Sequence, residues 1–120
     1  MILLSVAFGG AAGSCLRYLV GAWFFKLYPE FPWGTVLVNI VGSFLIGMVF
    51  PFLSSMEEHL RHLMIAGFLG GLTTMSGFSL ETITMVSLGR YSAAFANWFC
   101  GAILCALFCW IGMKAGRQIA

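Results

Sequence analysis

The residues best suited to chemistry lie in one run at the middle of the chain, Gly67–Ser79. Four glycines and four hydroxyl side chains stand here in an otherwise apolar segment; the hydroxyls belong to Thr73, Thr74, Ser76 and Ser79. The pair Gly70-Gly71 loosens helical geometry, and nearby hydroxyls compete for backbone hydrogen bonds, so carbonyl groups can leave the helix ladder. Inside a membrane, backbone groups freed in this way bind an ion or a solute. The run therefore predicts a broken membrane helix that presents its backbone to a ligand.

Arg17 is a charged residue within the first apolar stretch, on a face that also carries glycines at every fourth residue. An ionisable group at this depth is costly and tends to face a cavity, a partner or the interface. Two interpretations stay open. The side chain reaches the membrane surface and anchors the helix, or it places a positive charge at the mouth of an anion path.

Asn39, Phe78 and Glu81 need partners of their own. A buried amide costs roughly 2–7 kcal/mol unless it is bonded, so Asn39 donates to an anion or ties two helices together. Phe78 either packs in the core or presents the positive edge of its ring to a dehydrated anion. Glu81 either takes part in proton coupling or supports a pore wall by binding a basic or hydroxyl side chain.

The composition places all these groups in a lipid bilayer. Of the 120 residues, 61% are hydrophobic and 8% are charged, with a mean hydropathy of +0.99. A spanning helix takes about 20 mostly apolar residues, so the chain has room for four spans and no separate soluble domain. The net charge of +2 is small and its basic residues are scattered, which does not indicate a nucleic-acid partner.

Turn signals divide the chain into four spans, near residues 2–25, 34–53, 62–88 and 92–113. We expect an all-α membrane protein formed by one four-helix transmembrane domain, with the third helix broken. Basic residues are nearly balanced between the two sides of the membrane, which is typical of a chain that inserts in both orientations. The expected location is the inner (plasma) membrane, which the chain crosses several times.

The fourth span contains a row of small or polar residues at every fourth position, Asn97, Gly101 and Cys105. We expect this row to serve helix packing. All four cysteines fall in the spans, where cysteine usually acts as a small apolar residue, so we expect no metal site among them.

Three motifs follow one another in the first three spans. They are Gly9-Gly-Ala-Ala-Gly13 with Arg17-Tyr18, Gly34-Thr-Val-Leu-Val-Asn39 with Gly42, and Gly67-Phe-Leu-Gly-Gly-Leu-Thr-Thr74 with Phe78-Ser79. In this order and spacing they resemble the CrcB/Fluc family of small fluoride channels. The resemblance implies an antiparallel, dual-topology homodimer that lets fluoride leave the cell passively through two narrow pores, which relieves fluoride toxicity.

The resemblance also implies roles for single residues. A structural sodium ion at the dimer centre would be held by backbone carbonyls at Gly70 and Thr73. Asn39 and Phe78 would line the fluoride pore, and Arg17 would lie near its aqueous vestibule. The expected pore wall is completed by Met75, Ser76, Ser79 and Thr82.

Two departures from the family pattern stand out. Met75 replaces the first of two aromatic residues, and Gly77 replaces a threonine. In the fourth span, a family track of hydroxyls is matched to Ala102 and Ala106, which carry no donor. These losses permit an alternative, in which the chain is a pore-degraded subunit that pairs with a second, similar chain in a heterodimer.

Three other classes compete with a fluoride channel. A small multidrug transporter has the same size and topology but depends on a carboxylate in its first span, whereas this chain has Arg17 there and no acidic residue before Glu30. A structural or assembly subunit would tolerate changes at Asn39 or Phe78. An enzyme is disfavoured because no nucleophile, base and orienting group occur as a set.

Overall fold

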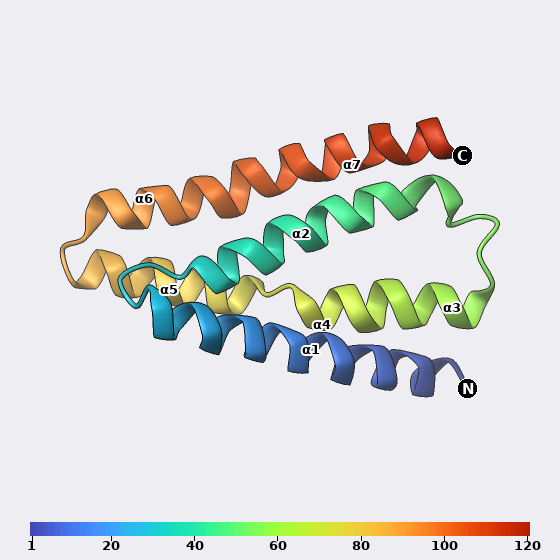
Figure 1. Cartoon of the computed structure of the whole chain (residues 1–120), viewed down its shortest axis with the longest axis horizontal. Helices are drawn as coiled ribbons and strands as arrows, with labels where there is room; N and C mark the ends of the chain where they lie inside the picture. The colour runs from blue at the N-terminus through green and yellow to red at the C-terminus, as the bar shows by residue number, and fades with distance from the viewer.

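A computed structural model describes all 120 residues, and every regular element in it is a helix. Four helices are long and apolar enough to cross a membrane: Ile2–Leu27, Trp33–Phe52, Glu58–Ser87 and Tyr91–Ile119. They run alternately in opposite directions, so both termini lie at the same end of the bundle (Figure 1). The predicted all-α fold with four possible membrane spans is confirmed.

Two of the spans are divided into several elements. The first span is the single helix α1, Ile2–Leu27, and the second is α2, Trp33–Val49, extended by a 3-10 turn at Phe50–Phe52. The third consists of α3 (Glu58–His62), a π-helical segment (Leu63–Leu69), α4 (Gly70–Leu72) and α5 (Met75–Ser87). The fourth consists of α6 (Tyr91–Phe99), a π-helical segment (Cys100–Leu104) and α7 (Cys105–Ile119).

The third helix begins at Glu58, four residues before the predicted start at His62. Glu57 causes the difference, because its carboxylate accepts the backbone N–H groups of His59 at 3.1 Å and Leu60 at 3.0 Å and so caps the helix. The bond from His59, followed by that from Leu60, lowers the pKa of Glu57 from its ordinary value. The acidic stretch predicted as a link therefore starts the helix.

The fourth helix also extends further than predicted, to Ile119 rather than Met113. The charged residues at its end lie on the helix itself. Lys114 places its ammonium over the ring of Trp110, 5.4 Å from the ring centre, and this contact favours continued helix.

Glycines allow the helices to pack backbone against backbone. A Cβ added at Gly13 of α1 would overlap the carbonyl oxygen of Phe68, and one added at Gly112 of α7 would overlap that of Phe44 in α2. The close approach expected from the glycine face of the first span is therefore present. Beyond these contacts the bundle is thin: only 16 of 120 residues are buried, so most apolar side chains are left for lipid or for another chain.

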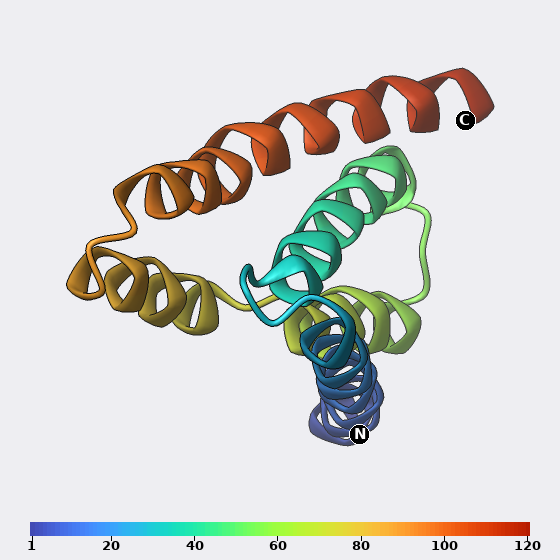
Figure 2. The same ribbon diagram turned by 60° about the vertical axis from the view of Figure 1, so that its left-hand side comes forward.

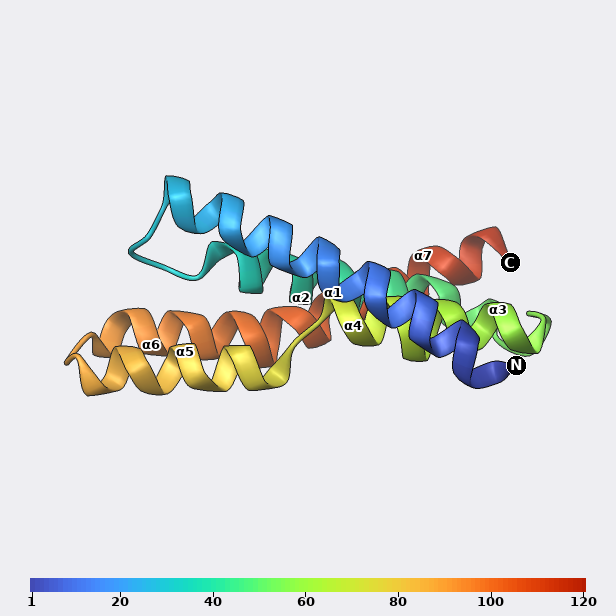
Figure 3. The same cartoon turned by 90° about the horizontal axis from the view of Figure 1, so that it is seen from below.

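The second half of the third span separates from the first half. After α4 the chain extends and α5 turns away from α1 to lie along α6 (Figure 2). Seen from below, α5 and α6 form one pair and α1 and α2 another, joined through the middle of the third span (Figure 3). The residues at this junction form the candidate site.

Candidate functional site

The third span leaves the helical path at Thr73 and Thr74. Thr73 has φ −85° and ψ 155°, and Thr74 has φ −148° and ψ 117°, both extended. Thr74 is also the N-cap of α5, since its hydroxyl accepts the backbone N–H of Gly77 at 3.1 Å. The hydroxyl of Thr73 donates to the carbonyl of Leu69 at 2.9 Å. Both threonines therefore use their side chains on the local backbone.

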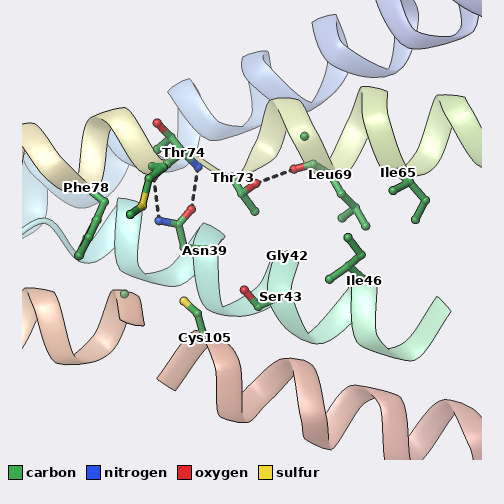
Figure 4. A pocket seen from close by; sticks show the side chains of 13 residues that line it. Asn39, Gly42, Ser43, Ile46, Ile65, Leu69, Thr73, Thr74, Phe78 and Cys105 are labelled. Carbon is green, nitrogen blue, oxygen red and sulfur yellow. Dashed lines mark hydrogen bonds between the residues drawn. The ribbon is translucent and has the colours of Figure 1, made fainter. Parts of the chain in front are cut away.

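Asn39 of α2 binds the extended segment from the side. Its Oδ1 accepts the backbone N–H of Thr74 at 2.8 Å, and its Nδ2 donates to the carbonyl of Thr74 at 3.1 Å (Figure 4). Asn39 thus ties two helices together, one of the two interpretations that the sequence left open. The second hydrogen of Nδ2 has no partner in the chain and remains available to an anion.

The carbonyl oxygens of Gly70 and Thr73 lose their helical partners at this point. In a continuous helix they would accept the N–H groups of Thr74 and Gly77, four residues further on. Those N–H groups bond instead to Asn39 and to the Thr74 hydroxyl. Unwound backbone carbonyls are ligands for sodium in membrane proteins, so the donor type at Gly70 and Thr73 fits a monovalent cation.

Arg17 binds the C-terminal end of α4. Its Nε donates to the carbonyl of Gly71 at 2.9 Å, across 54 positions of sequence. A cation at the C-terminus of a helix segment is favoured by the partial negative charge of its unpaired carbonyls. Arg17 therefore contacts the middle of the third span, which is not the surface anchor that the sequence offered as one alternative.

An open hollow of about 350 Å³ runs along the extended segment, between α2, the third span and the fourth helix (Figure 4). It brings together five of the predicted site residues: Asn39, Gly70, Thr73, Met75 and Phe78. Phe78 is buried, with 8% of its surface exposed, whereas Met75 is 73% exposed and lies at the rim. Ser43 and Cys105 line the same hollow and were not among the predicted site residues. Their spacing of four from Asn39 and Gly101 was the signal that could have found them.

Ser76, Ser79 and Thr82 do not line this hollow. Ser76 and Ser79 are exposed on the outer face of α5, and Ser79 donates to the carbonyl of Met75 at 2.9 Å. Thr82 points inward and donates to the carbonyl of Phe78 at 2.8 Å. The predicted pore wall therefore divides between two faces of α5 within one chain.

Ala102 and Ala106, which the resemblance matched to the family's hydroxyl track, do not line this hollow. Both alanines are exposed, whereas the fourth-helix residues that line the hollow are Gly101 and Cys105. Gly101 and Cys105 lie four residues apart and, with Asn97, keep one face of the fourth helix turned toward the third span.

Glu81 of α5 has a hydroxyl partner, as one of its two interpretations required. Thr35 of α2 donates to its Oε1 at 2.6 Å, and the other carboxylate oxygen, Oε2, is buried without a partner. The pair joins α2 to α5 beyond the extended segment. With Asn39, it makes α2 the helix that holds the extended segment and the second half of the third span.

Comparison with known proteins gives a consistent result. Residues 4–113 match the family described as "CrcB-like protein, Camphor Resistance (CrcB)". The chain is similar to proteins named "Fluoride-specific ion channel FluC". That of Campylobacter lari is 43% identical over 92% of this chain and 93% of its own length. That of Sulfurovum sp. is 42% identical over 98% of this chain and 95% of its own length. That of Rhizobium etli strain CIAT 652 is 53% identical over 71% of each protein.

Proposed function

The chain belongs to the CrcB-like protein family, and from this premise we propose that it is a fluoride channel that lets fluoride leave the cell passively and so relieves fluoride toxicity. The observation that carries the proposal is the hollow at the extended segment. There an amide donor of Asn39, the ring of Phe78 and unpaired backbone oxygens meet inside an apolar bundle. The relatives' name is that of an ion channel, which supports a channel rather than an enzyme.

Asn39 and Phe78 supply complementary chemistry for a small anion. The unused Nδ2 hydrogen of Asn39 donates to an anion in the hollow, and a ring edge of Phe78 offers the positive part of its quadrupole to an ion that has shed water. Met75 stands at the rim as a flexible thioether, which fills volume but provides no such edge. In the proposal, Phe78 is the aromatic contact, and Ser76 and Ser79 contribute from the exposed face of α5.

A second copy of the chain completes the path. The hollow is open, and Met75 and Leu80 on the outer face of α5 are about 70% exposed. Lipid cannot satisfy the carbonyls freed at the extended segment, so another protein surface has to cover them. The near balance of basic residues on the two sides supports an antiparallel, dual-topology pair in the plasma membrane. Each of two pores is then lined by both subunits.

The decisive experiment is fluoride efflux from liposomes that contain only this protein. We expect rapid efflux of fluoride, measured with a fluoride electrode after the membrane potential is released, and no comparable efflux of chloride. Protein-free liposomes are the control. A well-folded dimer without fluoride efflux would contradict the homodimeric channel and favour the heterodimer with a second similar chain.

Removal of sodium tests the proposed cation site at Gly70 and Thr73. Purification and assay with an organic cation in place of sodium should lower both the fluoride efflux and the melting temperature. A ligand present at a hundred times its dissociation constant stabilises a protein by about 2.7 kcal/mol. Adding sodium back should restore both quantities, and potassium is the matched control. Equal efflux and melting temperature in all three cations would show that sodium has no structural role.

A further inference from the structure

The fourth-helix row was expected to serve packing, but its first two members have a more specific arrangement around Phe78. We propose that Asn97 and Gly101 are positioning residues that fix Phe78 in the wall of the ion path and thereby set its selectivity. The inference rests on the proposed function. Phe78 is held at two points, its backbone and its ring.

The backbone of Phe78 is held through a chain of hydrogen bonds. Asn97 donates from Nδ2 to Oγ1 of Thr82 at 2.9 Å, and that hydroxyl donates to the carbonyl of Phe78 at 2.8 Å. Asn97 is fully buried, with 0% of its surface exposed. A hydroxyl that accepts and donates at once is polarised, and in a dry interior both bonds are strengthened. The chain thus ties α6 to the turn of α5 that begins at Phe78.

Packing alone does not account for an amide at position 97. The Oδ1 of Asn97 is buried and has no hydrogen-bond partner. An unpaired buried oxygen is costly, and a leucine would occupy similar space without that cost. The useful interaction of Asn97 is therefore its bond to Thr82.

The ring of Phe78 packs against Gly101, one helical turn after Asn97, because glycine has no side chain to occupy that space. A Cβ added there would lie 2.7 Å from Cδ2 and 2.8 Å from Cζ of Phe78 and would overlap Cε2. The ring therefore rests on bare backbone of the fourth helix, toward which it points in Figure 4. Any larger residue at position 101 has to push the ring toward the hollow or change the angle of its plane.

Selectivity follows from the position of this ring. An edge contact with an anion depends on both distance and angle, so a ring that moves by the width of a methyl group changes the size of ion that it accepts. Because its backbone and ring are both held by the fourth helix, Phe78 keeps one position. The fourth helix then determines discrimination between fluoride and the larger chloride.

The test compares variants of the hydrogen-bond chain in liposomes. Asn97→Leu and Thr82→Val should each lower the ratio of fluoride to chloride efflux by about tenfold, and the double variant should fall no further. Thr82→Ser keeps the hydroxyl and should retain the wild-type ratio. Thr84→Val is the matched control, because Thr84 makes the same kind of bond, to Leu80 at 2.8 Å, on an exposed face of α5. Unchanged ratios, or losses that multiply in the double variant, would overturn the proposal.

Gly101→Ala tests the seat of the ring, with Ala96→Val on the exposed face of α6 as its control. The position of the ring is followed directly by 19F NMR of the full dimer carrying 4-fluorophenylalanine at position 78. Asn97→Leu and Gly101→Ala should shift this signal, and Thr84→Val and Ala96→Val should not. This readout holds even if the wild-type protein passes no fluoride, a result that would reject the proposed function alone. An unmoved signal in both variants would reject the inference.

Discussion

Replacing Asn39 with leucine is expected to reduce fluoride efflux by up to about a hundredfold, since two part-buried hydrogen bonds are lost and each contributes on the order of 0.5–1.5 kcal/mol. Leucine offers no acceptor to the N–H of Thr74, which can then return to the carbonyl of Gly70. That change would restore helix at the extended segment and remove one proposed sodium ligand. The same substitution also removes the amide hydrogen available to an anion.

Asn39→Asp separates these two effects. The carboxylate still accepts the N–H of Thr74, so the extended segment should persist, but it donates to neither the carbonyl of Thr74 nor an anion. We expect Asn39→Asp, which keeps one of the two hydrogen bonds, to lose efflux and to melt below the wild type but above Asn39→Leu. Wild-type efflux in Asn39→Leu would contradict the central place of this residue.

Replacing Arg17 with leucine is expected to lower both stability and efflux. The carbonyl of Gly71 would lose its partner, and hydrogen bonds to charged groups contribute about 1.5–3 kcal/mol. The substitution also removes the positive charge that faces the end of α4. Thermal unfolding in detergent and efflux from liposomes measure the two consequences separately.

Arg17→Gln distinguishes the bond from the charge. Glutamine retains an N–H donor for the carbonyl of Gly71 but no positive charge. If the vestibule role proposed for Arg17 is correct, Arg17→Gln should recover part of the stability and little of the efflux. Full efflux in Arg17→Gln would reject the vestibule role, and full stability in Arg17→Leu would reject the role at α4.

Most of the architecture could be predicted from the composition and from the turn-forming residues between apolar stretches. Long apolar stretches separated by proline, glycine and charged residues predict the four spans, because the bilayer requires a fixed length of apolar helix. The errors fell at helix ends. Glu57 is a helix cap that reads as part of a polar link, and Lys114 lies on a helix that was expected to have ended. Charged residues occur equally in caps, last turns and loops, so their type alone does not decide where a helix ends.

The site was predictable as a set of residues but not as a set of contacts. Glycines and threonines near Gly70 predicted where the third span leaves the helical path, since these residue types act on the neighbouring backbone. Arg17 bonds to Gly71, and Asn39 bonds to both backbone groups of Thr74. These contacts depend on the depth and the rotation of each helix in the bundle. In a membrane chain nearly every helix face is apolar, so hydrophobic periodicity leaves this rotation open.

The sequence by itself therefore determined the membrane class, the four spans and the segment Gly67–Ser79 that carries the site. Tertiary structure decided that Thr82 points inward to Asn97, and that Gly101 and Cys105, rather than Ala102 and Ala106, face the hollow. The physical reason is that spacing shows which residues share a helix face, as Asn97, Gly101 and Cys105 do, whereas the rotation of the helix in the bundle decides what that face contacts.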